Sequence, residues 1–285
     1  MDLDPDLHNI YACLKACRGV DVTSYRPSVM EGKITGRMEA VGCGSTSDYL
    51  RYLMTNPGEF ELLISALTVN VSRFFRNAMT FEFICNIVLS DIFLRKREAN
   101  DRSVRIWSAG CAAGEEPYSL AILINEKMET EKEKFDIGIF ATDIDEFILE
   151  KAKEGVYSFE SVKEVKYGHI RKYFSICNDR FKLDSDIINQ VNFSKYDLFH
   201  PKTYAPPESV FGGFDLILCR NVLIYFQSGF QEIIFDKLMR SLSVNGYLVL
   251  GKTETLPSRF RQHADVISEY CHVYKKINNR SPREP

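Results

Sequence analysis

Residues 106–118 read Ile-Trp-Ser-Ala-Gly-Cys-Ala-Ala-Gly-Glu-Glu-Pro-Tyr, and this stretch decides the fold. An apolar run that begins at Val104 gives way to a turn containing Gly110 and Gly114, and Pro117 suits the first turn of a following helix. Glycines in such a turn let the backbone approach a ligand at the carboxyl end of a strand. The stretch therefore predicts a strand, a ligand-binding turn and a helix.

The same alternation continues along the chain. Three further apolar runs alternate with helical patterns, the runs lying at 135–141, 214–219 and 247–250, and the helical patterns at 118–128, 145–153 and 230–242. Strands that are apolar on both faces are typical of a sheet covered by helices on both sides. We therefore predict a doubly wound α/β sheet over residues 104–276.

The remaining segments predict smaller parts. Short apolar clusters separated by turn signals predict an N-terminal helical domain over 1–66, joined by a linker and helix at 67–103. Residues of about 155–200 do not fit a single crossover helix and predict an inserted antiparallel β-subdomain. Its two strands are expected at 180–183 and 190–194, around a turn at 184–186, and the polar end 277–285 is expected to be a disordered tail.

The charge balance and the cysteine spacing argue against several classes of protein. The chain has 285 residues and a net charge of −3, and residues 1–66 carry all of it, with the six cations Lys15, Arg18, Arg26, Lys33, Arg37 and Arg51 against nine acids. No global basic surface is available for nucleic acid. The eight cysteines form no CxxC pair, which argues against zinc, so we expect no metal. Neither a secretory signal nor a membrane span is visible, so we expect a cytoplasmic protein without direct membrane insertion.

The residues of the glycine turn limit the class of ligand that it can bind. A phosphate loop needs Lys and Ser or Thr after its last glycine, whereas here Glu115 and Glu116 would repel a phosphate. The second strand ends in Asp143, and an acid at that place commonly accepts hydrogen bonds from ribose hydroxyls. Asp145 fits better as the N-cap of the next helix. Together these features favour S-adenosylmethionine, whose sulfonium is positive, over NAD.

Four ordered motifs resemble one family, the chemotaxis receptor glutamate methyltransferases known as CheR. The resemblance runs from roughly residue 67 to 275, includes the inserted β-subdomain and extends loosely to the N-terminal helices. It implies a class I S-adenosylmethionine-dependent enzyme that forms glutamyl methyl esters on the cytoplasmic helices of chemoreceptors and releases S-adenosylhomocysteine. The motifs are Asn-Val-Ser-Arg-Phe-Phe-Arg at 70–76, Trp-Ser-Ala-Gly-Cys-Ala-Ala-Gly-Glu-Glu-Pro-Tyr-Ser at 107–119, Ala-Thr-Asp-Ile-Asp at 141–145 and Cys-Arg-Asn-Val-Leu-Ile-Tyr-Phe at 219–226.

The resemblance also implies roles for individual residues. Arg76 and Tyr225 match residues placed near the transferred methyl group and are the predicted catalytic residues. The predicted cofactor-binding residues are Asn70, Ser72, Arg76, Gly110, Glu116, Asp143, Asp197, Leu198, Arg220 and Asn221. Two positions depart from the family pattern: Ser72 replaces the more frequent threonine and keeps the hydroxyl, whereas Asp197 replaces the usual asparagine and loses an amide donor beside the adenine.

Other functions remain open from the sequence. A methyltransferase of the same fold could act on a small molecule or RNA, although the acidic N-terminal segment does not suit RNA. A non-catalytic S-adenosylmethionine-binding scaffold of a signalling array would keep the glycine turn and Asp143 without needing Arg76 or Tyr225. The expected partners are chemoreceptor helices and not nucleic acid, and we expect a monomer.

Overall fold

The computed structural model describes residues 5–18, 20–67, 72–209 and 213–278. The chain divides into two compact units. The first consists of Met1–Asn70 and Tyr225–Gln231, and the second of Val71–Ile224 and Glu232–Pro285. Each unit has its own hydrophobic core, so each is described by itself.

The first unit is a helical domain, as predicted. Its helices are α1 (Pro5–Arg18), α2 (Pro27–Val41), α3 (Thr46–Thr55) and α4 (Gly58–Leu67). Their apolar faces meet in a core that includes the fully buried Ile10, Leu14 and Leu53. The segment 225–231 belongs to this unit because the Arg26 N–H donates to the Tyr225 carbonyl at 2.8 Å and the Gln227 side chain donates to backbone carbonyls of this unit.

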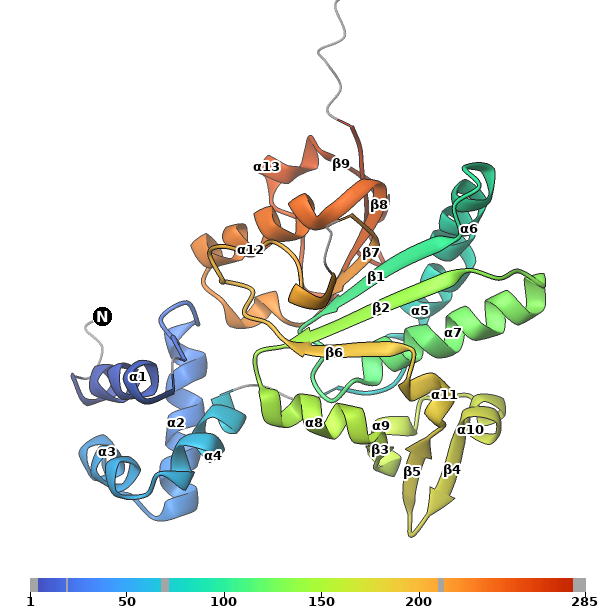
Figure 1. Ribbon diagram of the computed structural model, residues 1–285. Helices are drawn as coiled ribbons and strands as arrows, with labels where there is room; N and C mark the ends of the chain where they lie inside the picture. Colours follow the sequence, from blue (N-terminus) through green and yellow to red (C-terminus); the bar gives the residue numbers. More distant parts are fainter. Residues whose placement is uncertain (1–4, 19, 68–71, 210–212, 279–285) are drawn as a thin grey trace, which may run out of the picture. The chain divides into compact units, whose positions relative to one another are not determined.

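The second unit is built on a seven-stranded sheet, shown in Figure 1. In spatial order the strands are β6 (Val191–Lys195), β2 (Asp136–Asp143), β1 (Ser103–Ala109), β7 (Phe214–Cys219), β8 (Leu242–Leu250), β10 (Val273–Lys276) and β9 (Ala264–Ser268). Five neighbouring strands are parallel, and β10 then runs antiparallel to β8 and β9. Predicted site residues lie at the carboxyl ends of four of the parallel strands, β6, β2, β1 and β7.

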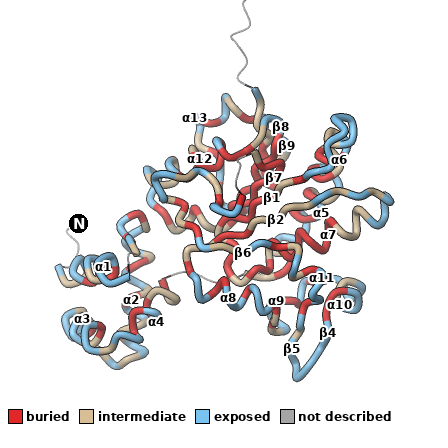
Figure 2. The backbone as a smooth tube through the Cα atoms, viewed as in Figure 1, coloured by how far each residue is buried: buried red, intermediate tan, exposed pale blue. Residues whose placement is uncertain are grey.

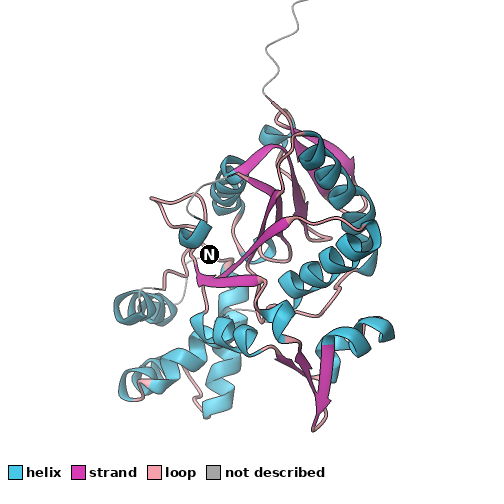
Figure 3. Ribbon diagram, turned by 45° about the vertical axis from the view of Figure 1, so that its right-hand side comes forward, coloured by secondary structure: helices cyan, strands magenta, loops and turns pink. Residues whose placement is uncertain are grey.

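Helices cover both faces of this sheet, as Figures 1 and 3 show. On one side lie α6 and α7, and on the other lies α12. Outside residues 155–190, the helices of this unit are α5 (Ala78–Phe83), a π-helical turn η1 (Ile84–Val88), α6 (Leu89–Glu98), α7 (Glu115–Glu131), α8 (Glu146–Glu154), α12 (Ser228–Ser241, whose first turn belongs to the first unit) and α13 (Ser258–Arg261), with short 3-10 turns η2 (Pro207–Ser209) and η3 (Leu223–Tyr225).

The core of the second unit follows the central strands. Figure 2 shows that these strands are buried along much of their length, and every residue of β7 is buried. Trp107 is fully buried and donates from its indole nitrogen to the Thr142 hydroxyl at 2.9 Å. Helices α7 and α12 are among those that bury apolar side chains here. No helix among the described residues has the length and apolarity that crossing a bilayer requires.

The inserted β-subdomain is present, but the predicted hairpin is wrong. The small sheet has the order β3-β5-β4, formed by β3 (Val156–Tyr157), β5 (Arg180–Leu183) and β4 (Phe174–Cys177), with α9 (Phe159–Val162) and α10 (Tyr167–Tyr173) between β3 and β4. Residues 190–194 fall mostly in β6, which pairs in parallel with β2 at the edge of the large sheet. Edge strands show the same half-exposed alternation as hairpin strands, so the pattern was ambiguous.

The predicted turn at 184–186 is also different in the structure. Asp184 accepts hydrogen bonds at the start of a short helix, α11 (Ser185–Ile188), which connects the small sheet to β6. Of the predicted tail, Ile277 and Asn278 are described, and the Ile277 N–H donates to the His263 carbonyl at 2.9 Å, while 279–285 lie outside the described residues.

Candidate active site

The topology brings most predicted site residues to one edge of the large sheet. Parallel strands end at the same edge, and an open α/β sheet binds its ligand there, beside the strands where the chain order reverses. Here that point lies between β1 and β7. Gly110 follows β1, Asp143 ends β2, Asp197 and Leu198 follow β6, and Arg220 and Asn221 follow β7. Asn70 lies outside the described residues.

The glycine turn is locked into a conformation that favours glycine. Gly110 has φ +75°, and a Cβ atom placed there would lie 2.4 Å from Val222 Cγ2. The N–H groups of Gly110 and Cys111 both donate to the Thr142 carbonyl, at 2.8 and 3.0 Å. The turn is therefore held against β2 on one side and packed against the segment after β7 on the other.

The two aspartates at the carboxyl end of β2, Asp143 and Asp145, accept hydrogen bonds from different segments. Asp143 accepts hydrogen bonds from the N–H groups of Ala112 at 3.0 Å and Asp145 at 3.1 Å, so it ties the glycine turn to the strand end. Burial raises the pKa of Asp143, although the backbone donors oppose this. Asp145 accepts from the N–H groups of Phe147 and Ile148 and caps α8, as predicted.

Glu116 and Arg220 form a buried ion pair at the centre of the site. Arg220 Nη1 lies 3.1 Å from Glu116 Oε2, and the Ser108 hydroxyl donates to Glu116 Oε1 at 2.8 Å. Burial raises the pKa of Glu116, and the attraction to Arg220 opposes that shift. Because the pair is desolvated, removing either partner would leave an uncompensated buried charge.

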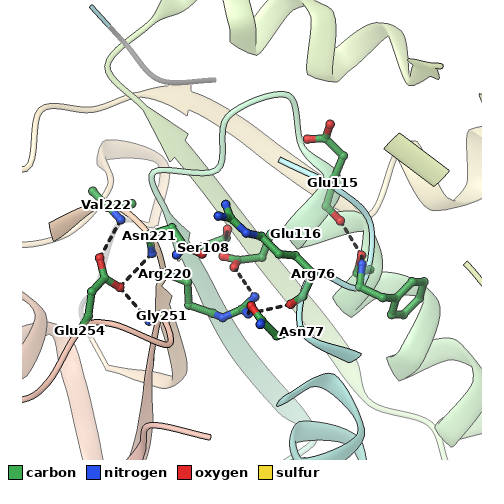
Figure 4. Close-up of polar contacts among 12 residues, drawn as sticks. Arg76, Asn77, Ser108, Glu115, Glu116, Arg220, Asn221, Val222, Gly251 and Glu254 are labelled. Carbon is green, nitrogen blue, oxygen red and sulfur yellow. Dashed lines mark hydrogen bonds and ion pairs between the residues drawn. The ribbon is translucent and has the colours of Figure 1, made fainter. Parts of the chain in front are cut away.

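Arg220 also fixes the segment that carries Arg76. Its Nη2 donates to the Arg76 carbonyl at 2.7 Å and to the Asn77 side chain at 3.2 Å. Figure 4 shows the guanidinium groups of Arg76 and Arg220 extending toward the Glu116 carboxylate. Arg76 is half-buried. The preceding Phe75 has φ +54°, and its N–H donates to the Ser119 hydroxyl at 2.9 Å.

Ser72 makes a contact that the sequence did not suggest. Its hydroxyl and that of Ser161 lie near enough to the Glu115 carboxyl group to lower its pKa, while Glu115 Oε2 is buried without a hydrogen-bond partner among the described residues. Glu115 is only 3% exposed, and burial raises its pKa to about 7. The neighbouring acids at 115 and 116 therefore differ in their surroundings: Glu116 faces Arg220, whereas Glu115 meets hydroxyl groups.

A buried lysine of α12 contacts the segment after β6. Asp197 accepts from the Phe199 N–H at 2.8 Å, and Leu198 is buried. Lys237 of α12 is 4% exposed, donates to the His200 carbonyl at 2.8 Å and lies 5.0 Å from the centre of the Tyr196 ring. Burial lowers the pKa of Lys237 to about 8, and the charge of Asp197 opposes that shift. The acid that replaces the usual asparagine thus lies within the electrostatic range of a buried cation.

Tyr225 is half-buried and belongs to the first unit, whereas the other predicted residues that are described belong to the second. Burial raises the pKa values of Cys111 and Cys219, as expected for inert thiols rather than nucleophiles. Among the described residues no three His, Cys, Asp or Glu side chains are grouped so that they could hold a metal ion.

The donor set fits S-adenosylmethionine. Asp143 supplies carboxylate oxygens suited to ribose hydroxyls, and Glu116 is an acceptor suited to an amino group. Arg220 Nε is buried without a hydrogen-bond partner among the described residues, so it retains a donor for a ligand carboxylate. The absence of a side chain at Gly110 lets Val222 pack directly against the turn. Buried acids of this kind favour a cationic ligand over a phosphate.

Comparison with known proteins identifies the family. Residues 5–68 match the family described as CheR methyltransferase, all-alpha domain, and residues 70–271 match CheR methyltransferase, SAM binding domain. Chemotaxis protein methyltransferase of Borreliella burgdorferi is 30% identical over 241 residues, covering 84% of this chain and 83% of its own. Chemotaxis protein methyltransferase 2 of Vibrio cholerae is 34% identical (80% and 77% covered), and the Escherichia coli chemotaxis protein methyltransferase is 30% identical (83% and 79% covered).

These matches cover both units and confirm the predicted family, fold class and enzyme class. This chain belongs to the CheR family of S-adenosylmethionine-dependent chemotaxis protein methyltransferases.

Proposed function

We propose that this enzyme transfers a methyl group from S-adenosylmethionine to glutamate side chains on the cytoplasmic helices of chemoreceptors, forming glutamyl methyl esters and S-adenosylhomocysteine. The observation that carries the proposal is that both parts of the chain, 5–68 and 70–271, match the same methyltransferase family. We further propose a cytoplasmic monomer that needs no metal, with an N-terminal helical domain that ends near residue 66.

The bound cofactor supplies an electrophilic methyl group on a positively charged sulfur. The receptor glutamate is already ionised at neutral pH, since its reference pKa is about 4.3, so the reaction needs no general base. The protein must align the substrate carboxylate with the methyl group in a site shielded from water. Such alignment can lower the activation free energy by roughly 7 to 11 kcal/mol in favourable cases. Charge disappears as the ester forms, so tight pairing of the substrate carboxylate would also stabilise the ground state.

The proposed roles follow from this chemistry. Arg76 orients the substrate carboxylate, and Tyr225 donates a hydrogen bond or walls the methyl path. Asp143 accepts from the ribose, and Glu116 and Arg220 hold the methionine end beside Gly110. The proposed cofactor set further includes Asn70, Ser72, Asp197, Leu198 and Asn221.

A direct assay tests the function. Purified protein, methyl-labelled S-adenosylmethionine and membranes containing chemoreceptors of the same organism should yield base-labile label that is released as methanol. Cofactor binding without receptor label would contradict the proposal and favour a scaffold or a methyltransferase acting on a small molecule. Label transferred to RNA instead would point to the nucleic-acid alternative.

A further inference from the structure

Glu254 is a buried acid close to the site that none of the sequence motifs includes. It follows β8 and is 4% exposed. Its two carboxylate oxygens accept hydrogen bonds from five backbone N–H groups. Oε1 accepts from Val222 at 2.9 Å, Leu223 at 2.7 Å and Ile224 at 3.3 Å, and Oε2 accepts from Asn221 at 2.8 Å and Gly251 at 2.7 Å.

Four of these donors belong to one short segment, residues 221–224, which we call the β7 loop. It directly follows Arg220 and leads in sequence into Tyr225. Figure 4 shows Glu254 beside Asn221 and Val222. Asn221 has φ +59°, a left-handed conformation that asparagine tolerates better than most residues. The carboxylate therefore stabilises a backbone shape that the loop would not adopt by propensity alone.

Two glycines confine this arrangement. On one side, a Cβ at Gly110 would clash with Val222 of the β7 loop at 2.4 Å. On the other, a Cβ at Gly251 would lie 2.6 Å from Glu254 Oε2 and 2.7 Å from the Asn221 nitrogen. The β7 loop is thus held between the glycine turn and the Glu254 carboxylate. Both contacts are close, so a shift of the loop would disturb the glycine turn or the hydrogen bonds to Glu254.

The charge of Glu254 also reaches the centre of the site. Burial is the main cause that raises the pKa of Glu116, Arg220 opposes it, and the negative charge of Glu254 adds to the rise. The hydrogen-bond partners of Glu254 given above are backbone groups rather than lysine or arginine side chains. Its location is therefore set by the loop that it organises, and it lies near enough to influence Glu116.

We propose that Glu254 is a positioning residue of the cofactor site, which acts through the backbone of the β7 loop and not by contact with the reacting atoms. The inference rests on the proposed function for the identity of the cofactor. It differs from a merely structural role, because it predicts a loss of cofactor affinity beyond what an equal loss of stability elsewhere would cause.

Three variants weaken the contact in different ways. In Glu254→Gln, either orientation of the amide turns its NH2 group toward at least two backbone N–H donors, because each carboxylate oxygen accepts from two or more. Gly251→Ala keeps the carboxylate but pushes it away from the loop. Glu254→Asp keeps the charge with a shorter reach.

The matched control lies on β7, the strand that precedes the β7 loop. Asp215 of β7 is a buried acid that accepts from the Arg105 N–H at 3.0 Å and pairs with Lys96 at 3.2 Å, at the amino end of the strand that precedes the β7 loop. Asp215→Asn should lower the melting temperature without moving the loop.

The measurement is the affinity of the full chain for S-adenosylhomocysteine by isothermal titration calorimetry, which needs no receptor. We expect Glu254→Gln and Gly251→Ala each to raise Kd at least tenfold, Glu254→Asp to give a smaller increase, and Asp215→Asn to stay within twofold of wild type. Wild-type affinity in Glu254→Gln, or an equal loss in Asp215→Asn, would overturn the inference.

Folding failure does not remove the test. If Glu254→Gln does not fold, Glu254→Asp decides, and unchanged affinity in that variant would count against positioning. Failure of the proposed function has a different signature, since it would appear in the wild-type protein as absent S-adenosylhomocysteine binding or absent receptor methylation.

Discussion

The Arg220 guanidinium donates a hydrogen bond of 2.7 Å to the backbone carbonyl of Arg76, across 144 residues of sequence. The same guanidinium pairs with Glu116. One buried side chain therefore ties the segment that carries the predicted catalytic arginine to the helix after the glycine turn. Because the bond uses the Arg76 carbonyl, the Arg76 side chain can be removed without breaking it.

Arg76→Ala should therefore separate catalysis from folding. We expect a loss of at least tenfold in receptor methylation, or about 1.4 kcal/mol of transition-state stabilisation, without unfolding of the protein. Arg97→Ala is the control, because Arg97 is half-exposed and pairs only with Glu133 among the ion pairs described. Wild-type turnover in Arg76→Ala would refute its role.

Arg220→Lys should reduce both stability and activity. Lysine keeps the charge but loses the planar fork that reaches Glu116, Asn77 and the Arg76 carbonyl. Leaving such buried groups unsatisfied costs roughly 1 to 3 kcal/mol. Denaturant unfolding and methylation rates measure the two effects. Arg102→Lys at the exposed pair with Glu133 should change neither, and a similar result for Arg220→Lys would contradict the assigned role.

Gly110→Ala should destabilise the glycine turn in two ways that can be measured separately. The left-handed backbone costs roughly 1 to 2 kcal/mol, and the clash with Val222 adds an overpacking cost of about 1 to 3 kcal/mol. Adding Val222→Ala should recover only the second part. Gly36→Ala is the control, since nothing lies within 4 Å of a Cβ there. Equal stability of Gly110→Ala and wild type would rule out the described strain.

Glu115→Gln should change the pH dependence of stability. Folding raises the Glu115 pKa from its usual 4.5 to about 7, so the folded state binds the proton more tightly than the unfolded state. The contribution of Glu115 to the free energy of unfolding is therefore fully present below pH 4.5, and it is lost as the pH rises through 7. The variant should therefore be more stable than wild type at pH 8, by roughly 3 kcal/mol at most. Thermal unfolding across pH measures this, and a variant less stable than wild type at pH 8 would contradict it.

Tyr225→Phe tests the hydroxyl group alone. The Tyr225 backbone carbonyl that accepts from Arg26 is kept in this variant, so the fold of the first unit should persist. We expect unchanged cofactor affinity and slower methyl transfer, measured by titration calorimetry and the methanol-release assay. Transfer at the wild-type rate would limit Tyr225 to a packing role.

The sequence predicted the large sheet because its signals are local. Strands such as 214–219 are mostly apolar, and the glycine turn and the Asp145 cap depend on neighbouring residues. The hairpin prediction at 190–194 failed because alternation reports half-burial and does not report the partner strand. Pairing with β2 is a long-range fact that no local pattern contains.

The site residues likewise divide into those with a local sequence signal and those defined only by long-range contacts. Glu254 and Lys237 carry no motif signal, since their surroundings come from segments far away in sequence. Four of the six cations counted in residues 1–66 form ion pairs within the first unit. Lys15 pairs with Asp21, Arg18 with Glu61, Arg51 with Asp48, and Arg37 binds the buried Glu59 through two nitrogens. Composition counts charges but does not show which ones are already neutralised.

The segment 225–231 has a consequence for the modularity of this enzyme. It lies far along the chain, yet Gln227 donates to the Thr23 and Tyr25 carbonyls, and the Phe226 ring lies 4.6 Å from that of Tyr25. A fragment ending at residue 67 would lack these contacts and expose the apolar surface that they cover. Exchange of N-terminal domains between homologous enzymes by recombination at a single crossover should therefore produce mismatched chimeras, and inheritance of 1–67 and 225–231 from one parent should restore their stability.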